Sequence, residues 1–315
     1  MKSSNIGGQA VLEGIMMKNG PKYAVAVRKP DGEIEVKVEE YKSVIKWEKL
    51  TKIPFIRGVF NFVDSLVLGM KTLTYSASFW EEETEELITA EEAKKQKKKE
   101  DFIMGITMAF SVILAMGLFM VLPYFISDLF AGIIKSRFLR TVLESVVRIS
   151  LFILYILAVS RMKDIQRTFM YHGAEHKCIN CIEHGMELNL ENVKRSSKQH
   201  KRCGTSFLFF VMIVSVIVCF FITVDSQLLR VVLRLALLPV IAGISYEIIK
   251  LAGSSTHPLV ELLSKPGLAM QNLTTKEPED DMIEVAIKAV EEVFDWKTYL
   301  KENFEEKEDD LKTSL

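Results

Sequence analysis

The chain has 315 residues, 49% of them hydrophobic, and its 40 Lys+Arg are balanced by 41 Asp+Glu to a net charge of −1. Without a basic excess, nucleic acid is disfavoured as a main partner. The hydrophobic fraction and a mean hydropathy of +0.18 exclude an ordinary water-soluble enzyme and favour a membrane protein.

The N-terminal segment has the pattern of a small β-rich domain. Alternating runs at 23–28 and 33–38 flank the turn sequence Pro30-Asp31-Gly32, which predicts a β-hairpin. A Gly-rich stretch, GGQAVLEGIMM, precedes the hairpin. We expect the β domain to cover about the first 45 residues and to lie in the cytoplasm.

The next apolar stretch, Ile53–Trp80, is interrupted by charged residues at Arg57, Asp64 and Lys71. This mixture favours an interfacial or re-entrant helix over a span, although a fifth crossing stays open. The lysine-rich run at 94–99 follows and is typical of a solvated linker on the cytoplasmic side of a span.

Four apolar segments are long enough to cross about 30 Å of hydrocarbon. The first, Phe102–Phe125, contains no charge, whereas the second and the fourth do; the others are Val142–Val159, Phe207–Val224 and Val231–Ile249. The fold class predicted is an α-helical polytopic membrane protein with about four transmembrane helices.

The orientation of these spans follows from the positions of Lys and Arg in the loops. The 126–141 loop has only Lys135, Arg137 and Arg140, whereas the 161–205 loop carries Arg161, Lys163, Arg167, Lys177, Lys194, Arg195, Lys198, Lys201 and Arg202. The long loop is therefore predicted to be cytoplasmic. An even number of spans then places both chain ends in the cytoplasm of a multi-pass cell-membrane protein, with the lipid bilayer as its partner.

Charged residues inside the predicted spans need partners. Glu144 and Arg148 stand four apart on one helical face, close enough to pair, while Arg234 and Glu247 lie near opposite ends of the fourth span. Arg148 is the residue expected to face a bundle interior or a water-filled cavity. Structural pairing is favoured over a transport or proton path.

The C-terminal tail contains an amphipathic helical pattern after Thr275, with Pro278 suited to a first helical position. Its apolar residues share one face and are Ile283, Ala286, Ile287, Val290 and Val293. This helix is expected to dock on the cytoplasmic domain. The organisation predicted is a cytoplasmic β-rich segment (1–50), an interfacial or re-entrant helix with a Lys-rich linker (51–100), transmembrane helices (101–160 and 206–252), a cytoplasmic His/Cys/Glu loop (161–205) and a cytoplasmic tail (253–315).

The 161–205 loop holds most of the chain's histidines and cysteines. Within it, His172-Gly173-Ala174-Glu175-His176 matches H-x-x-E-H, the inverted zincin pattern of two zinc-binding histidines and a glutamate base. On a helix, residues four apart share a face, so both imidazoles can bind one ion. Glu175 then lies within reach of a water that the ion activates. The pattern predicts a divalent metal, zinc by preference, with Glu175 as the catalytic group.

Further ligands are expected from the turn before the third span. His200 and Cys203 can fold back to complete a tetrahedral set, so the preferred metal ligands are His172, His176 and His200, with Cys203 as a fourth.

Other polar residues of this loop have weaker claims. Cys178 and Cys181 form C-x-x-C but fall on a different helical face, so buried reduced thiols are favoured over ligands. Glu183 returns to the histidine face and is expected to orient a ligand or to serve a second metal. His184 is expected at the surface before the turn residue Gly185.

Several stretches, from residue 7 to the C-terminal helix, match one known family. They are GGQAVLEG with Met16-Met17, Arg57-Gly58, YHGAEHK at 171–177, RCGTSF at 202–207, Ser245-Tyr246-Glu247, and QNLTT at 271–275 with Glu277-Pro278. On these residues the sequence resembles the YqhQ-like bacterial membrane proteins, a family of unknown function described as predicted metal-dependent enzymes. The resemblance implies a multi-pass membrane protein with a metal site at His172, Glu175, His176, His200 and Cys203. Cys178 and His184 are not part of the family pattern.

Two classes of function fit these patterns, with transport as a third. The first is a metal-dependent hydrolase that acts at the cytoplasmic face on a peptide or a lipid-linked ester. The second is a non-catalytic scaffold, adaptor or transporter with a structural metal site. The number of ligands separates them, because three protein ligands leave an open position and four close the site. A membrane-protein partner or a homo-oligomer is compatible with either class.

Overall fold

The computed structural model describes residues 2–43, 53–80, 90–222, 224, 226–255 and 257–304. Within helix α2, Ala90–Met116, it describes side chains from residue 98 on, except that of residue 101. The contacts divide the chain into two compact units. Unit 1 comprises Met1–Trp80, Leu157–Val211 and Pro239–Leu315, and unit 2 comprises Glu81–Ile156 and Met212–Leu238.

Unit 1 begins with a four-stranded antiparallel sheet of order β1-β2-β3-β4. Its strands are β1 Gly7–Val11, β2 Gly14–Asn19, β3 Lys22–Arg28 and β4 Ile34–Glu40. The predicted hairpin is confirmed as β3 and β4, and Gly32 in its turn has a φ of 87°, which glycine adopts without strain. The Gly-rich stretch before it forms β1 and β2, which the alternation pattern did not reveal.

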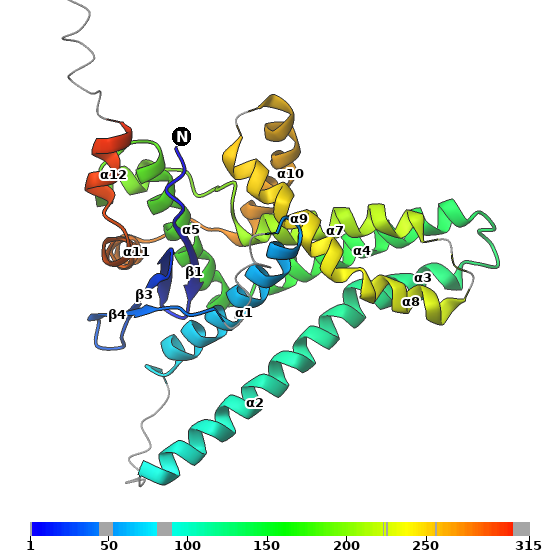
Figure 1. The fold of residues 1–315 in the computed structure, drawn as a ribbon, viewed down its shortest axis with the longest axis horizontal. Helices are drawn as coiled ribbons and strands as arrows, with labels where there is room; N and C mark the ends of the chain where they lie inside the picture. Colours follow the sequence, from blue (N-terminus) through cyan, green and yellow to red (C-terminus); the bar gives the residue numbers. More distant parts are fainter. Residues whose placement is uncertain are drawn as a thin grey trace, which may run out of the picture. The chain divides into compact units, whose positions relative to one another are not determined.

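The two central strands, β2 and β3, are buried on both faces because they alternate two sets of apolar residues. One face, with Ile15, Met17, Ala24 and Ala26, packs in one core with α5 Lys163–Glu183 and α11 Asp280–Val293. Residues of the opposite face, including Val25, pack with Leu68 of α1 Ile56–Ala77. Figure 1 shows α5 and α11 beside the sheet. The predicted docking of the amphipathic C-terminal helix on the β domain is thereby confirmed.

Unit 1 contains four further described helices, of which α6 and α12 pack against this core. They are α6 Leu190–Arg195, α9 Leu238–Ser254, α10 Pro258–Thr274 and α12 Trp296–Asn303. The segment predicted as a long loop between the second and third spans is therefore largely helical, and α5 accounts for half of it. Three of the described helices contribute residues to both units: α4 Arg137–Val159, α7 Gly204–Phe221 and, through its first residue Leu238, α9.

The described part of unit 2 consists mainly of helices. They include α2 Ala90–Met116, the π-helical η2 Gly117–Val121, α3 Leu122–Leu129 and α8 Gln227–Ala236. The lysine-rich run at 94–99, predicted as a linker, lies within α2, where side chains are described only from Lys98.

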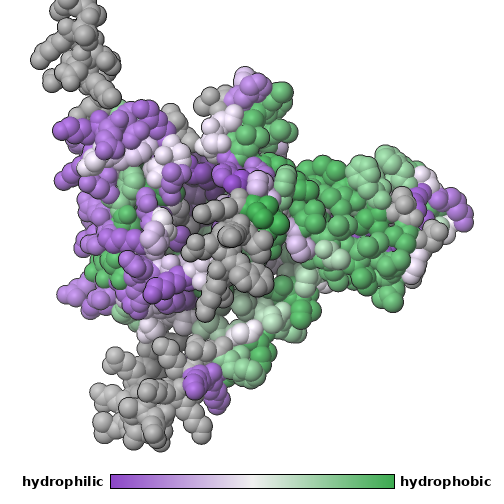
Figure 2. Space-filling view, viewed as in Figure 1, coloured by the Kyte–Doolittle hydropathy of each residue, from purple (hydrophilic) through white to green (hydrophobic). Residues whose placement is uncertain are grey.

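Four helices of the described residues are long and apolar enough to cross a membrane: Lys98–Leu129, Arg137–Val159, Gly204–Phe221 and Leu228–Ser254. Each overlaps one predicted span, so the positions of the four apolar helices are confirmed. Helix α1 is not among them. Figure 2 shows hydrophobic residues covering the face of α4, α7 and α8 that is in view, and hydrophilic residues over α12.

Candidate functional site

Helix α5 carries the H-x-x-E-H motif and ends where the sequence predicts. Gly185 follows the helix with a φ of 82°, a conformation that stops a helix and favours glycine. The helix packs against β1, β2 and α11, so most of its C-terminal half is buried. The motif is therefore held on a rigid element inside unit 1.

His172 and His176 lie next to each other on α5, with their ring centroids 4.4 Å apart. Cys203, the residue directly before α7, joins them. One ligand atom from each of these three residues lies within 4.8 Å of the others. The sulfur of Cys203 is 3.2 Å from Nε2 of His172, close to the roughly 3.5 Å that separates a sulfur and a nitrogen ligand around tetrahedral zinc.

Backbone carbonyl groups fix the orientation of both imidazole rings. Nδ1 of His172 lies 2.9 Å from the carbonyl oxygen of Thr274, and Nδ1 of His176 lies 2.7 Å from that of Lys198. A carbonyl oxygen only accepts, so each Nδ1 carries the proton and donates it. Nε2 of each ring therefore keeps its lone pair, as a metal ligand requires. The two histidines and Cys203 thus fit a divalent metal of the zinc type.

His200 lies beside this cluster but outside it. Its ring centroid is 5.8 Å from that of His176, and its Nε2 is 3.4 Å from Oε2 of Glu183. Gln271 holds the backbone of His200 from both sides, since its Oε1 accepts from the N–H and its Nε2 donates to the carbonyl. The structure brings together three of the four predicted metal ligands and places the fourth in a separate hydrogen-bonded position.

Glu175 is buried next to strand β1. The backbone N–H of Gly8 bonds to its carboxylate, and Oε2 has no hydrogen-bond partner among the described residues. Burial raises the pKa of Glu175 to about 7, against the opposing effects of His172 and the Gly8 N–H. A methyl group at Gly8 would lie 2.9 Å from Cδ of Glu175, so the strand approaches this closely only because residue 8 is glycine.

Glu183 forms the centre of a second polar group on the same helix. Its carboxylate accepts from the N–H and hydroxyl of Ser4, at 2.7 and 2.8 Å, and from Arg202. Burial opposes ionisation, but the hydrogen bond from His200 and the charge of Arg202 outweigh it and lower the pKa of Glu183 to about 2. Glu183 therefore orients His200.

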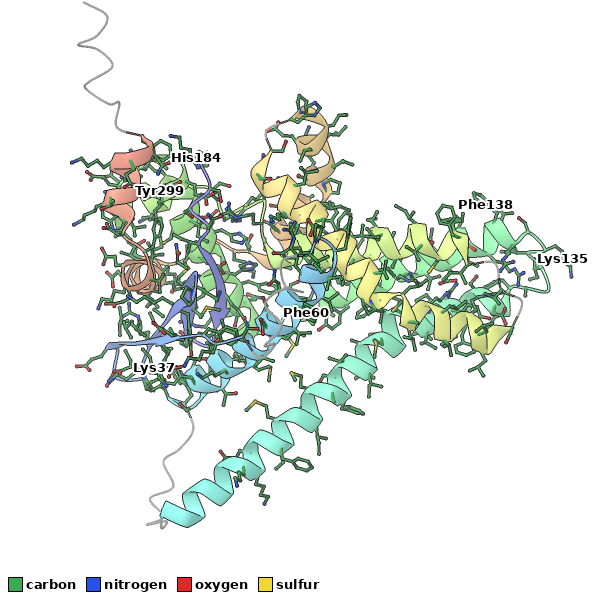
Figure 3. The ribbon with its side chains drawn as sticks, viewed as in Figure 1. Lys37, Phe60, Lys135, Phe138, His184 and Tyr299 are labelled. Carbon is green, nitrogen blue, oxygen red and sulfur yellow. The ribbon has the colours of Figure 1, made fainter. Side chains whose placement is uncertain are left out.

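The other polar residues singled out from the sequence lie away from the cluster. Cys178 and Cys181 are buried in the core between α5, the sheet and α11, and both are free thiols. Burial raises the pKa of the Cys178 thiol well above its usual value, so the thiolate that binds metals is disfavoured. His184, labelled in Figure 3, is exposed at the end of α5 and bonds to the carbonyl of Asn180.

The sequence did not reveal the groups that support the cluster. The carbonyl oxygens of Lys198 and Thr274 carry no side-chain signal. Gly173 permits the contact between His172 and the carbonyl oxygen of Thr274. A methyl group at residue 173 would lie 2.0 Å from the carbonyl oxygen of Lys276 and would push this segment away. Lys276 in turn bonds through its N–H to the carbonyl of Phe169. Helix α5 and the 274–276 segment are therefore in direct backbone contact beside His172.

Comparison with known proteins identifies the family of this chain. A family model described as "Protein of unknown function (DUF1385)" matches residues 53–296. The chain belongs to this family. It is also 36% identical over 292 residues to the Uncharacterized protein YqhQ of Bacillus subtilis (strain 168), an alignment that covers 91% of each chain. The predicted family is thus confirmed, and no solved structure matches the chain.

Proposed function

We propose that this chain is a multi-pass membrane protein with a metal-dependent hydrolytic site formed by His172, His176 and Cys203, for which zinc is the preferred ion. The single observation that carries the proposal is the commitment of both Nδ1 atoms to backbone carbonyls, which leaves two Nε2 lone pairs beside a cysteine sulfur. With His200 held by Glu183, three protein ligands remain, and three ligands leave a position for substrate.

The residues around this position have separate roles in the proposed hydrolysis. A divalent ion, when bound, supplies Lewis-acid activation of water or of a carbonyl group. Glu175 takes up the proton of the attacking water, because it follows His172 by one helical turn and its Oε2 is not engaged by another described group. Thr274 and Lys198 hold the imidazoles in place. The buried surroundings exclude bulk water from these groups.

The position of the site along the chain supports the substrate class that we propose. Cys203 directly precedes α7, the third helix of membrane-spanning length, so the cluster lies at the end of a proposed span. A site at such a position fits a peptide or a lipid-linked ester presented at the membrane surface.

The proposed topology places both chain ends and the site in the cytoplasm, because the segment between the second and third spans is rich in Lys and Arg. A cysteine introduced at exposed Asn189 should be labelled by a membrane-impermeant reagent only from the cytoplasmic side, and one at Ser226 only from outside. The opposite labelling pattern would reverse the topology.

A structural metal site is the second candidate function. His200 lies close enough to His176 that a side-chain rotation which broke its bond to Glu183 would add a fourth ligand. Four ligands would close the site and leave no position for substrate. The two functions make opposite predictions for Glu175.

The deciding experiment is the Glu175→Gln variant of the detergent-purified protein. A hydrolytic site predicts that it keeps about one metal ion per chain and its thermal stability, yet fails to complement a strain that lacks the protein. Glu187→Gln, the same change at an exposed residue, is the matched control. A metal-loaded, stable Glu175→Gln protein that complements fully would exclude the hydrolase.

Metal binding itself is tested with two alanine variants. His176→Ala should lose the ion, whereas His184→Ala, at an exposed histidine outside the cluster, should keep it. Because the ligands must be deprotonated, affinity should also fall as the pH is lowered. Equal metal content in the two variants would show that the cluster is not the metal site.

A further inference from the structure

Unit 2 contains a small cavity whose lining is rich in arginine. It lies among Arg137, Arg140, Arg230, Arg234, Asp128 and Glu144, with Tyr124 and Cys219 also in its wall. These residues come from α3, the first two turns of α4, the end of α7 and the first two turns of α8. Figure 3 labels Lys135 and Phe138, which flank Arg137 in the chain.

The most deeply buried charges at this cavity do not balance. Glu144 is 4% exposed and pairs with two arginines, Arg148 at 2.7 Å and Arg234 at 2.7 Å, which are 2% and 5% exposed. One carboxylate therefore faces two buried guanidinium groups. Buried charges in a membrane-spanning region are costly unless they are paired, so one further negative charge would stabilise this group.

The rest of the cavity lining adds to the positive surplus. Four arginines and two acidic residues line it. Asp128 lies 3.8 Å from Arg140, so among the described lining residues a surplus of positive charge remains after this pair is counted.

Several hydrogen-bond donors at the cavity are unused. The Tyr124 hydroxyl, Nε of Arg140 and Nε of Arg234 are buried and have no hydrogen-bond partner among the described residues. Tyr124 is 3% exposed, and Arg234 lies over its ring at 4.8 Å. Buried donors are normally satisfied by protein, water or a ligand. Donors without partners beside surplus positive charge are suited to an acceptor that carries negative charge.

The helix directions support the same ligand. Arg137 is the first residue of α4, and Arg230 lies in the first turn of α8. The positive ends of both helix dipoles therefore lie near the cavity. Glu144 is seven residues into α4, or about 10 Å from its start, so the cavity lies near one end of this helix of membrane-spanning length, where a headgroup would be within reach if the helix crosses a bilayer.

We propose that this cavity binds a phosphate-type oxyanion. The hydroxyl of Tyr124 and the guanidinium groups of Arg140 and Arg234 donate hydrogen bonds to it, next to Glu144. Arginine suits this ligand because its planar guanidinium donates to two oxygens of a phosphoryl group at once. The same chemistry is offered by free inorganic phosphate and by the phosphodiester of an anionic phospholipid such as phosphatidylglycerol.

The test measures the thermal unfolding of the full chain in nanodiscs. Two arms distinguish the sources: phosphatidylcholine discs with added inorganic phosphate, and discs that contain phosphatidylglycerol without phosphate. At saturation the bound source should raise Tm by about 5 °C. A rise in the first arm identifies a free anion, and a rise confined to the second identifies a lipid headgroup. No rise in either arm would overturn the proposal.

Two variants connect the rise to the cavity. Tyr124→Phe removes one hydroxyl and keeps the ring on which Arg234 lies, so it should fold and lose at least half of the rise. Arg140→Gln should lose at least as much. Arg195→Gln, which removes a positive charge from an exposed residue on α6, is the control for bulk electrostatics. If Arg195→Gln weakened the rise as much as Arg140→Gln, or if Tyr124→Phe kept all of it, the cavity would not be the binding site.

Discussion

Glu144 and Glu183 are both buried glutamates that pair with arginine, one in each unit, and they differ in what surrounds them. Glu183 pairs with Arg202, whose side chain is 21% exposed, and also accepts from Ser4 and from His200. Glu144 pairs with two arginines that are almost fully buried. One carboxylate thus balances a partly hydrated cation, and the other is outnumbered by two dehydrated ones.

The difference shows what each group needs from outside the protein. Around Glu183, charges are balanced and its hydrogen bonds come from the chain itself, so the group orients His200 without a ligand. Around Glu144, a positive charge is left over and buried donors are unused. Polar groups of this second kind are expensive to maintain in a membrane and usually mark a functional position. We therefore expect Glu183 to position His200 and the neighbourhood of Glu144 to bind a ligand.

The largest effect is expected for Glu144→Ala, which leaves Arg148 and Arg234 buried without their carboxylate. Removing one partner of a buried ion pair costs roughly 3–5 kcal/mol. The variant should accumulate poorly and unfold at a much lower temperature. Glu247→Ala is the control, because the Glu247–Arg57 pair is about one-fifth exposed and a hydrated pair contributes about 0–1 kcal/mol.

A combined variant sharpens this prediction. Replacing all three of Glu144, Arg148 and Arg234 by Met or Leu removes the three buried charges at once. A protein whose buried ion group is replaced in this way often keeps its stability. The triple variant should be more stable than Glu144→Ala. If Glu144→Ala were as stable as wild type, the arginines would have to be neutralised by other groups, and the contrast with Glu183 would fail.

The next effect is expected for Gly173→Ala, which tests how the histidines are positioned. The new methyl group would lie 2.0 Å from the carbonyl oxygen of Lys276, a backbone atom that cannot move by itself. Overpacking of this kind costs about 1–3 kcal/mol. The shift should also displace Thr274 from Nδ1 of His172 and lower metal affinity roughly tenfold, as loss of a group that orients a ligand does.

Gly204→Ala is the matched control for this change, since a methyl group there meets nothing within 4 Å although Cys203 is its neighbour. Competition with a chelator gives the affinities, and thermal unfolding gives the stabilities. Equal metal affinity in the two variants would show that the carbonyl of Thr274 does not position His172.

The sequence predicted those features that depend on local periodicity. Strands β3 and β4 follow from alternation around a turn, α11 from apolar residues at helical spacing, and the four long apolar helices from their length. The proximity of His172 and His176 follows from their spacing of four residues on α5. In each case the determining residues lie within one element.

Features that depend on packing between distant elements could not be predicted. Strand β1 contains Gly8, whose role appears only where it meets Glu175. His200 stands three residues from Cys203 and so was expected to share its metal, but Gln271, 71 residues away, fixes its backbone elsewhere. Likewise Arg234 was placed near a span end, and only the packing of α8 against α4 reveals its pair with Glu144.

The smallest effect at neutral pH, and the most diagnostic pH dependence, is expected for Glu183→Gln. A neutral amide replaces hydrogen bonds to a charged group with weaker ones, at a cost of about 1–2 kcal/mol. Arg202 remains partly hydrated, so its loss of a partner costs less than at Glu144. Burial keeps the pKa of His200 below its usual value, so that ring needs no carboxylate to balance a charge at neutral pH.

The pH dependence follows from the pKa of Glu183, which is about 2 in the folded protein against 4.5 for a free glutamate. Because folding lowers this pKa, the stabilisation is complete above about pH 4.5 and is lost as the pH falls from there towards 2. Across that window the wild-type Tm should fall more steeply than that of Glu183→Gln, and the two should converge. Glu187→Gln, at an exposed position, should follow the wild-type curve. If the Tm of Glu183→Gln changed with pH as steeply as that of wild type, then Arg202, Ser4 and His200 would not stabilise the ionised form of Glu183. The contrast between the balanced group of unit 1 and the unbalanced group of unit 2 would then fail.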